Sequence, residues 1–169
     1  MLGSPYTKTV KSLIEKLMNA EKSITSGLED YLEEIYIAQL NDKPLKGAEL
    51  ARKLNISRAS VSEGLSRLVS KELIKYSSYE AIYLTKKGMI EAKKVYEKHH
   101  ILKNFFEKVL EIPADEASEN ACKIEHIVSQ NVLDKMIEFT KFYQENKDLI
   151  ENCKRKTLNN ELIINRQIS

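Results

Sequence analysis

The segment from Asn55 to Leu68 constrains the fold of this chain most strongly, because it combines a helix start, an apolar stripe and a small polar face. Ser57 has the chemistry of an N-cap, since its hydroxyl can accept a backbone N–H of the first helical turn. Val61, Leu65 and Leu68 recur at spacings of four and three residues, as one face of a helix requires. Such a helix leaves a polar face that can approach phosphates and base edges closely. That face carries Arg58, Ser60, Ser62 and Arg67.

The residues around this segment predict a winged helix-turn-helix. Residues 47–54 form the expected first helix, and a turn through Asn55 and Ile56 leads into the second helix. Residues 72–76 and 81–84 predict the two strands of a hairpin, joined by a short polar link. This combination favours DNA binding, and the alternative is a protein-binding domain built from the same elements. The expected buried side of the first helix comprises Ala48, Leu50, Ala51 and Leu54.

Charge is divided unevenly along the chain, although the formal net charge is only +2. Residues 43–98 contain 13 Lys and Arg against 6 Asp and Glu, a net charge of +7, and the remainder has 14 against 19, a net charge of −5. This asymmetry predicts a basic module that binds a polyanion and an acidic module with another task. Ala59 can touch a thymine methyl group, and Lys75 and Lys86 flank the hairpin as phosphate contacts. The full set of predicted DNA contacts is Ser57, Arg58, Ala59, Ser60, Ser62, Arg67, Lys75 and Lys86.

Composition excludes several classes of protein. The 169 residues allow one domain or two small ones, and 42% hydrophobic with 31% charged residues suits a mainly helical protein. The two cysteines, Cys122 and Cys153, form no CxxC motif and HExxH is absent, so the strong zinc signatures are missing. We find no signal-peptide pattern and no apolar run near the roughly 18 residues of a membrane span, and expect a cytoplasmic protein. No nucleophile–base pair or phosphate-cradling loop indicates an enzyme.

Two acidic residues stand out in the helix predicted from Ser26 to Leu40. Ser26 is the expected N-cap, with Glu29 completing a capping box. Asp30 and Glu33 are spaced i, i+3 and project together, which suits either a ligand pair or an acidic first turn that favours the helix dipole. The expected buried side carries Leu28, Tyr31, Leu32, Ile35 and Tyr36. Residues 1–25 precede it as an N-terminal extension with helical spacing at residues 9–18.

The C-terminal half predicts helices with a possible metal half-site. A long helix is expected at residues 86–110 after an N-cap at Thr85, and its apolar side carries Ile90, Val95, Ile101, Leu102, Phe105, Phe106 and Val109. In its middle, His99 and His100 point about 100° apart and face different surroundings. In the next helix, from about residue 114, Cys122, Glu125 and His126 share one face and form a credible metal half-site. The alternative is a small buried cysteine beside a surface Glu–His pair. Ser129 caps one more helix, whose expected inner side is Val132, Leu133, Met136, Ile137 and Phe139.

From about Gly27 to Tyr143 the chain resembles the diphtheria toxin repressor family of metal-dependent transcriptional regulators. The resemblance is carried by residues 28–36, the helix-turn-helix with its small-residue face, the Lys98-His99 step, and residues 121–126. It implies a mainly α fold, with a winged helix-turn-helix DNA-binding domain and a helical dimerisation and metal-binding domain. It also implies a homodimer that binds a palindromic double-stranded operator when loaded with Fe(II) or Mn(II).

The resemblance also implies a ligand set. By motif position, the primary site consists of Asp30, Cys122, Glu125 and His126. Glu33 and His99 occupy positions where the manganese-sensing branch has further ligands, and His99 also matches the iron-sensing branch's ancillary site. Lys103 and Ser118 do not match that ancillary site. Since a thiolate favours later metals than Mn(II), Fe(II) is slightly preferred.

The expected organisation has four segments: an N-terminal extension at 1–25, the winged domain at 26–98, the dimerisation and metal-binding domain at 99–143, and a helix or tail at 144–169. Too few residues follow Tyr143 for the SH3-like domain of the iron-sensing branch. The expected function is that of a metal-dependent transcriptional regulator of iron or manganese homeostasis genes, with repression as the expected output. The alternative is a metal-independent winged-helix transcription factor that senses a small organic ligand.

Overall fold

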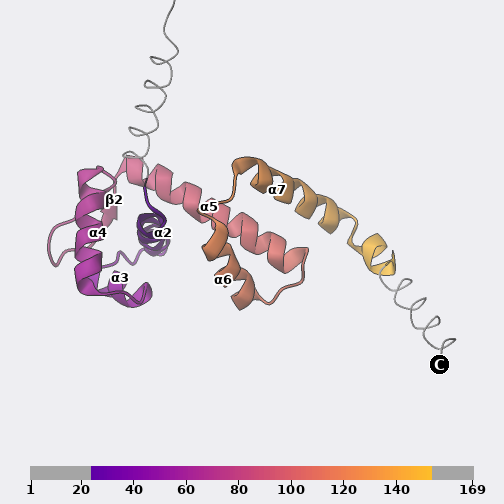
Figure 1. The fold of residues 1–169 in the computed structure, drawn as a ribbon, viewed down its shortest axis with the longest axis horizontal. Helices are drawn as coiled ribbons and strands as arrows, with labels where there is room; N and C mark the ends of the chain where they lie inside the picture. The colour runs from indigo at the N-terminus through magenta and orange to yellow at the C-terminus, as the bar shows by residue number, and fades with distance from the viewer. Residues whose placement is uncertain (1–23, 154–169) are drawn as a thin grey trace, which may run out of the picture. The chain divides into compact units, whose positions relative to one another are not determined.

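The computed structural model describes residues 24–153, and Figure 1 shows their fold. These residues are mainly helical, as predicted. In chain order the elements are α2 (Ser26–Leu40), α3 (Gly47–Lys53), α4 (Arg58–Ser70), β1 (Ile74–Lys75), β2 (Tyr83–Leu84), α5 (Lys86–Lys108), α6 (Ala114–Ile124) and α7 (Gln130–Glu145). The helix predicted at residues 9–18 lies outside the described residues, and so do the tail residues beyond 153.

The chain divides into two compact units, and the division falls between Ala92 and Lys93. The first unit contains α2, α3, α4, the two strands and the start of α5. The second unit contains the rest of α5 with α6 and α7, followed by helical residues 147–153. The domain boundary predicted at residues 98 and 99 stays a proposal, because α5 runs through it without a break.

The core of the first unit forms where α2 contacts α3, α4 and β2. Val61, Leu65 and Leu68 of α4 are buried, as their spacing predicts. Ser57 caps α4, because its Oγ accepts a hydrogen bond from Ser60 N at 3.0 Å. The predicted buried side of α2 is confirmed at Leu28, Tyr31, Leu32, Ile35 and Tyr36. Both apolar stripes therefore face one shared core.

The start of α2 differs from the prediction. Thr25 takes the N-cap position, and its backbone oxygen accepts hydrogen bonds from Leu28 N and Glu29 N at 2.9 and 3.0 Å. Ser26 is already the first helical residue, so the predicted capping box of Ser26 and Glu29 is wrong. The helix begins one residue earlier because the extended backbone of Thr25 lets the first turn close on its carbonyl.

The two strands form a small antiparallel wing, with Ile74 paired to Leu84 and Lys75 to Tyr83. Each strand has two residues, so the wing is shorter than predicted. One reason is that Glu72 adopts a left-handed conformation, with φ 60°, and turns the chain just before β1. A second reason is that Ala81 forms an isolated bridge with Lys46, away from the other strand.

The wing is joined tightly to α5. Thr85 Oγ1 accepts a hydrogen bond from Gly88 N at 3.0 Å and donates one to the Glu72 carbonyl at 2.7 Å, which confirms Thr85 as a cap. A Cβ atom at Gly88 would lie 1.8 Å from the backbone oxygen of Leu73. The first turn of α5 can therefore pass the end of β1 only with glycine at this position.

The second unit is built around Leu102 of α5, Ala121 of α6 and Leu133 of α7, all fully buried. Ser129 caps α7 as predicted, because its Oγ accepts a hydrogen bond from Val132 N. Tyr143 Oη donates a hydrogen bond to Glu111 Oε1 at 3.2 Å and ties the end of α7 to the loop after α5. Three α-helices thus share a narrow apolar seam.

Several residues expected in the core are exposed instead. They are Ala48 on α3, Ile90 on α5, and Val132, Ile137 and Phe139 on α7. Helical spacing identifies an apolar face, but it does not say whether a neighbouring element of the same chain covers that face. None of the helices in the described ranges combines the length and hydropathy needed to cross a membrane.

Candidate metal centre and DNA-binding surface

The end of α6 carries the candidate metal ligands of the second unit. Cys122 lies in the last turn, and Glu125 is the C-cap with helical backbone angles. Cys122 Sγ and a carboxylate oxygen of Glu125 lie within 4.8 Å of each other. His126 follows in a turn, so the prediction that the helix continues through His126 is wrong. Cys122 is exposed and Glu125 fully buried, which is the reverse of the alternative with a buried cysteine and a surface glutamate.

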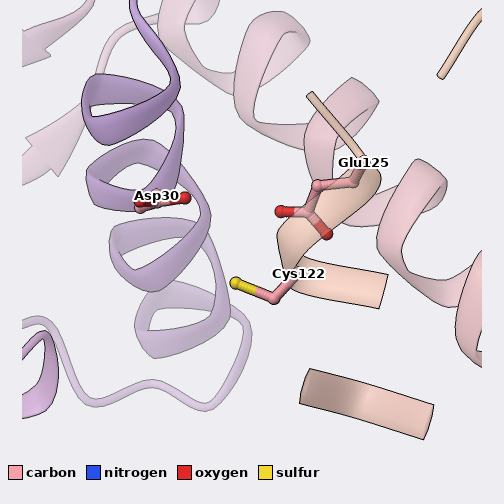
Figure 2. Close-up of side chains that lie close together, drawn as sticks. All are labelled: Asp30, Cys122 and Glu125. Atoms are coloured by element: carbon pink, nitrogen blue, oxygen red, sulfur yellow. The ribbon is translucent and has the colours of Figure 1, made fainter. Parts of the chain in front are cut away.

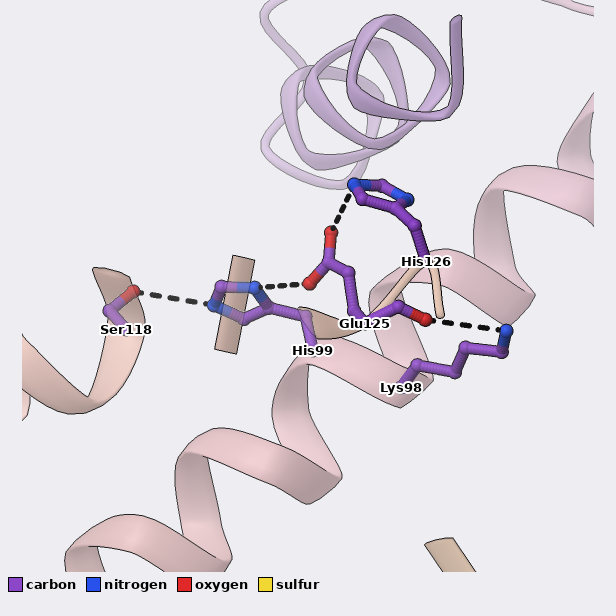
Figure 3. Close-up of polar contacts among 5 residues, drawn as sticks. All are labelled: Lys98, His99, Ser118, Glu125 and His126. Atoms are coloured by element: carbon purple, nitrogen blue, oxygen red, sulfur yellow. Dashed lines mark hydrogen bonds and ion pairs between the residues drawn. The ribbon is translucent and has the colours of Figure 1, made fainter. Parts of the chain in front are cut away.

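Glu125 lies at the centre of a network of polar side chains, which Figure 3 shows. Its Oε2 lies 2.7 Å from His99 Nδ1, and its backbone oxygen accepts a hydrogen bond from Lys98 Nζ at 3.4 Å. Its Oε1 lies 3.5 Å from His126 Nε2 and makes no hydrogen bond to any described residue. A buried carboxylate oxygen without a hydrogen bond is costly, and a cation is the partner it favours.

The donor atoms in the second unit are a thiol sulfur, a carboxylate and two imidazoles. This mixture suits divalent transition metals better than Mg²⁺ or Ca²⁺, which prefer oxygen ligands throughout. Together with the orphaned Glu125 Oε1, the donor set fits a divalent metal. Figure 2 shows the Cys122 and Glu125 side chains, and Asp30 on α2.

The two adjacent histidines have different surroundings, as predicted. The His99 ring reaches Glu125 on one side, and its Nε2 lies 3.3 Å from Ser118 Oγ. The His100 ring packs edge-on against Tyr96, with ring centroids 4.2 Å apart. Partial burial lowers the pKa of His100, and the neighbouring His99 and Lys103 lower it further. Of these two adjacent histidines, only His99 therefore contacts Glu125 at the candidate metal centre.

The acidic pair of the first unit lies on α2. Glu33 is buried and Asp30 is half-buried. Burial raises the pKa of the Tyr31 hydroxyl, and the negative charges of the neighbouring Asp30 and of Glu63 raise it further. Tyr31 donates a hydrogen bond to the Ser60 carbonyl of α4 at 3.3 Å, so α2 is tied directly to the predicted DNA-binding helix.

The predicted DNA-binding residues lie on exposed parts of the first unit. Arg58, Ala59, Ser62 and Arg67 are exposed on α4, Lys75 on β1, and Lys86 at the start of α5. Ser57 and Ser60 are also exposed, but their hydroxyls lie 2.9 Å apart and bond to each other, so part of their hydrogen-bonding capacity is used within the helix.

Sequence reasoning missed the residues that line a hollow between α4 and the wing. Arg58 and Ser62 share this hollow with Lys46, Ser78 and Tyr79, and no carboxylate lines it. Tyr79 is 92% exposed and has a left-handed backbone, with φ 69°. Its isolated position in the short polar link between the predicted strands was the available signal, because a large aromatic residue there has no core to join.

Comparisons with known proteins agree with this layout. Residues 23–82 match the iron dependent repressor N-terminal DNA-binding domain, and residues 85–151 match the iron dependent repressor metal-binding and dimerisation domain. An uncharacterized HTH-type transcriptional regulator of Methanocaldococcus jannaschii is 37% identical over 123 residues, which cover 72% of this chain and 98% of that relative. The chain belongs to the iron-dependent repressor family. The predicted family and the predicted fold class are both confirmed.

Two of the similar solved structures are manganese-responsive regulators by name. The HTH-type transcriptional regulator MntR of Geobacillus thermodenitrificans is 26% identical over 81% of this chain and 96% of its own length. The solved manganese regulator SloR is 32% identical with a TM-score of 0.61, over 68% of this chain and 54% of that one. A manganese-dependent transcriptional repressor in complex with manganese is 26% identical with a TM-score of 0.63, over 68% of this chain and 53% of that one. The chain thus spans about half the length of these solved regulators.

Proposed function

We propose that this protein is a metal-dependent transcriptional regulator of iron or manganese homeostasis genes, and that it acts as a repressor. It binds double-stranded operator DNA as a homodimer when loaded with Fe(II) or Mn(II). The observation that carries the proposal is the fully buried Glu125, whose Oε1 makes no hydrogen bond to a described residue and which lies beside a thiol and two imidazoles. A domain of the same chain carries an exposed helix face suited to DNA.

The proposed ligand set is the one that motif position implies. Cys122, Glu125, His126 and His99 supply the sulfur, oxygen and nitrogen donors of the second unit, and Asp30 and Glu33 supply carboxylates from α2. The metal, when bound, would supply positive charge that offsets the carboxylates and the thiolate. The thiolate favours Fe(II), since Mn(II) binds most weakly among these metals at a given site. The names of two similar solved structures favour Mn(II).

The proposed mechanism is a shift between two populations. Without metal, the negative charges of the carboxylates and the thiolate are uncompensated, and α2 is held loosely. A bound metal would neutralise these charges and hold α2 more firmly, and α2 contacts α4 through the hydrogen bond from Tyr31 to Ser60. In a homodimer this fixes the spacing between the two α4 helices, and half-sites about one helical turn apart are read only at the correct spacing.

The proposed dimer surface is an apolar groove between α5 and α7. Phe105, Val132, Met136, Phe139 and Phe142 line it. The rings of Phe105, Phe139 and Phe142 form a row with centroids 6.3 and 6.2 Å apart, and Phe142 is 54% exposed. Exposed aromatic rows of this kind mark association surfaces. The groove lies in the segment that matches a dimerisation domain, so we assign it to a second copy of this chain.

The test measures DNA binding as a function of metal. DNA fragments are first selected from a random pool by the Mn(II)-loaded protein. Binding is then titrated anaerobically with Fe(II), Mn(II) and Zn(II), for the wild type and a Cys122→Ala, Glu125→Ala double variant. A Cys153→Ala variant is the matched control, because this exposed cysteine lies outside the proposed ligand set. Circular dichroism shows whether each variant is folded.

Metal-dependent binding that the double variant loses and the control keeps is the expected result. Strong binding without metal, unchanged in the folded double variant, would overturn the proposal. It would favour the alternative, a winged-helix factor that senses a small organic ligand. One hollow of the first unit could hold such a ligand, since it is lined by Asp30, Tyr31 and Arg67 beside α4.

A further inference from the structure

Ser118 lies on α6, one helical turn before Cys122, and faces the candidate metal centre through His99. Its Oγ lies 3.3 Å from His99 Nε2, while His99 Nδ1 lies 2.7 Å from Glu125 Oε2. Figure 3 shows the ring of His99 between these two partners. The two nitrogens of one imidazole are thus engaged on opposite sides, by a carboxylate and by a hydroxyl.

A neutral imidazole has one N–H and one lone pair, so its two nitrogens cannot play the same role. When Nδ1 donates its proton to Glu125, Nε2 carries the lone pair and needs a donor. When Nδ1 binds a metal through its lone pair, Nε2 carries the proton and needs an acceptor. A ligating histidine is therefore oriented by the group that bonds to its other nitrogen.

A hydroxyl can meet both requirements, because it donates one hydrogen bond and accepts others. An ionised carboxylate in place of Ser118 would only accept, and an ammonium group would only donate. Ser118 is held on the regular part of α6, away from either helix end, so its position relative to the ring is set by the helix backbone. The hydroxyl can rotate to suit the ring without any movement of the backbone.

We propose that Ser118 is a positioning residue, which orients the His99 ring and stabilises its metal-binding tautomer. The inference rests on the proposed function and deepens it, since it names a residue that tunes metal affinity without touching the metal. In the metal-free protein, Ser118 donates to Nε2. In the loaded protein, the Nε2–H donates to Ser118, and Nδ1 keeps its lone pair directed at the ion.

The first measurement is Mn(II) affinity by anaerobic calorimetry. Ser118→Ala removes the hydroxyl and is expected to weaken Mn(II) binding about 10- to 100-fold, the usual cost of losing such a partner. Ser118→Thr keeps the hydroxyl and is expected to restore most of the affinity. Asn120→Ala is the matched control on the same helix, because its side-chain amide donates to the Glu116 carbonyl at 2.8 Å and Asn120 lies outside the proposed ligand set. It should leave the affinity unchanged.

The second measurement reports on the ring itself. Nitrogen-15 NMR of histidine-labelled protein distinguishes the two tautomers, in the metal-free state and with diamagnetic Zn(II). The wild type is expected to carry the proton on Nδ1 without metal and on Nε2 with Zn(II). With Zn(II), the Nε2–H of the Ser118→Ala variant should exchange with water faster than in the wild type. A purely structural role for Ser118 would leave that exchange unaltered.

The two proposals fail in different ways. Equal Mn(II) affinity and equal Nε2–H exchange in the wild type and in Ser118→Ala would overturn the role of Ser118 and leave the metal-dependent function standing. A wild type that binds none of Fe(II), Mn(II) and Zn(II) would overturn both. Loss of affinity in Ser118→Ala that Ser118→Thr does not restore would also count against the hydroxyl.

Discussion

At the scale of single residues, the buried carboxylate of Glu125 is costly unless a metal binds beside it. It is fully buried, and its carboxylate contacts His99 at 2.7 Å and His126 at 3.5 Å. A buried charge is retained only where its partners compensate for lost hydration. A site that serves metal binding explains why this position carries a carboxylate and not an apolar residue of similar volume.

Glu125→Gln removes the charge and nearly preserves the shape. We expect it to abolish most of the metal-induced stabilisation, which for the wild type is about 2.7 kcal/mol at a free metal concentration 100 times Kd. The melting temperature of the metal-free variant should stay close to that of the wild type, since an amide oxygen can still accept from His99. Thermal unfolding with and without Mn(II) measures both. Glu119→Gln, an exposed residue paired with Lys123, should retain the full metal effect.

At the scale of elements, sequence patterns were reliable where one helix faces one core. The stripe of Val61, Leu65 and Leu68 is buried as predicted, because a single helical period brings all three to the same side. The wing was predicted too long, since the left-handed turn at Glu72 is a backbone feature that residue types alone did not reveal. The end of α6 was placed too late for a similar reason, because no glycine or proline marks the turn at His126.

The junction of the wing and α5 gives a stability prediction. Gly88→Ala places a Cβ against the Leu73 backbone oxygen, which cannot move without opening the wing. We expect a loss of about 1–3 kcal/mol in the free energy of unfolding, the range for overpacked sites. Gly27→Ala has no atom within 4 Å of the new methyl group and should be neutral or slightly stabilising. Urea denaturation of both variants makes the comparison, and equal stabilities would contradict the tight junction.

The exposed face of α4 gives a prediction about DNA. Arg58→Ala should weaken DNA binding and reduce the slope of log affinity against log salt by about one unit, as the loss of one phosphate contact requires. Lys108→Ala, an exposed residue of the second unit, is the charge-matched control and should leave the slope unchanged. Fluorescence anisotropy at several salt concentrations measures the slope. If Arg58→Ala keeps both affinity and slope, the proposed placement of α4 on DNA is wrong.

At the scale of the whole molecule, the sequence predicted the two kinds of domain because each has local motifs. It did not identify the proposed association surface, since Val132 and Phe139 have the spacing of core residues and only the structure shows them exposed. The candidate ligands were likewise predicted from motif positions, whereas the contact between Ser118 and His99 depends on how α5 and α6 pack. Contacts between elements far apart in sequence are the part that residue patterns do not contain.

The apolar groove gives a prediction about assembly. Phe139→Glu places a carboxylate among the aromatic rings of a surface that we assign to a second copy. We expect this variant to be monomeric at concentrations where the wild type is a dimer, because a buried unpaired charge costs several kcal/mol. Ile90→Glu, an exposed apolar residue of the first unit outside the groove, should remain dimeric. Sedimentation equilibrium measures the oligomeric state of both variants. A dimeric Phe139→Glu would contradict the assignment of this groove as the dimer interface.

The central claim is that metal binding and DNA binding are coupled. The most direct measurement is the dissociation constant of Mn(II) with and without the selected DNA. The dissociation constant of Fe(II) is measured anaerobically in parallel. If metal favours the DNA-binding form, DNA must tighten metal binding by the same factor, typically about 5- to 150-fold. The account predicts tighter metal binding in the presence of DNA, and loss of this difference in Glu125→Gln. Equal metal affinity with and without DNA would contradict it.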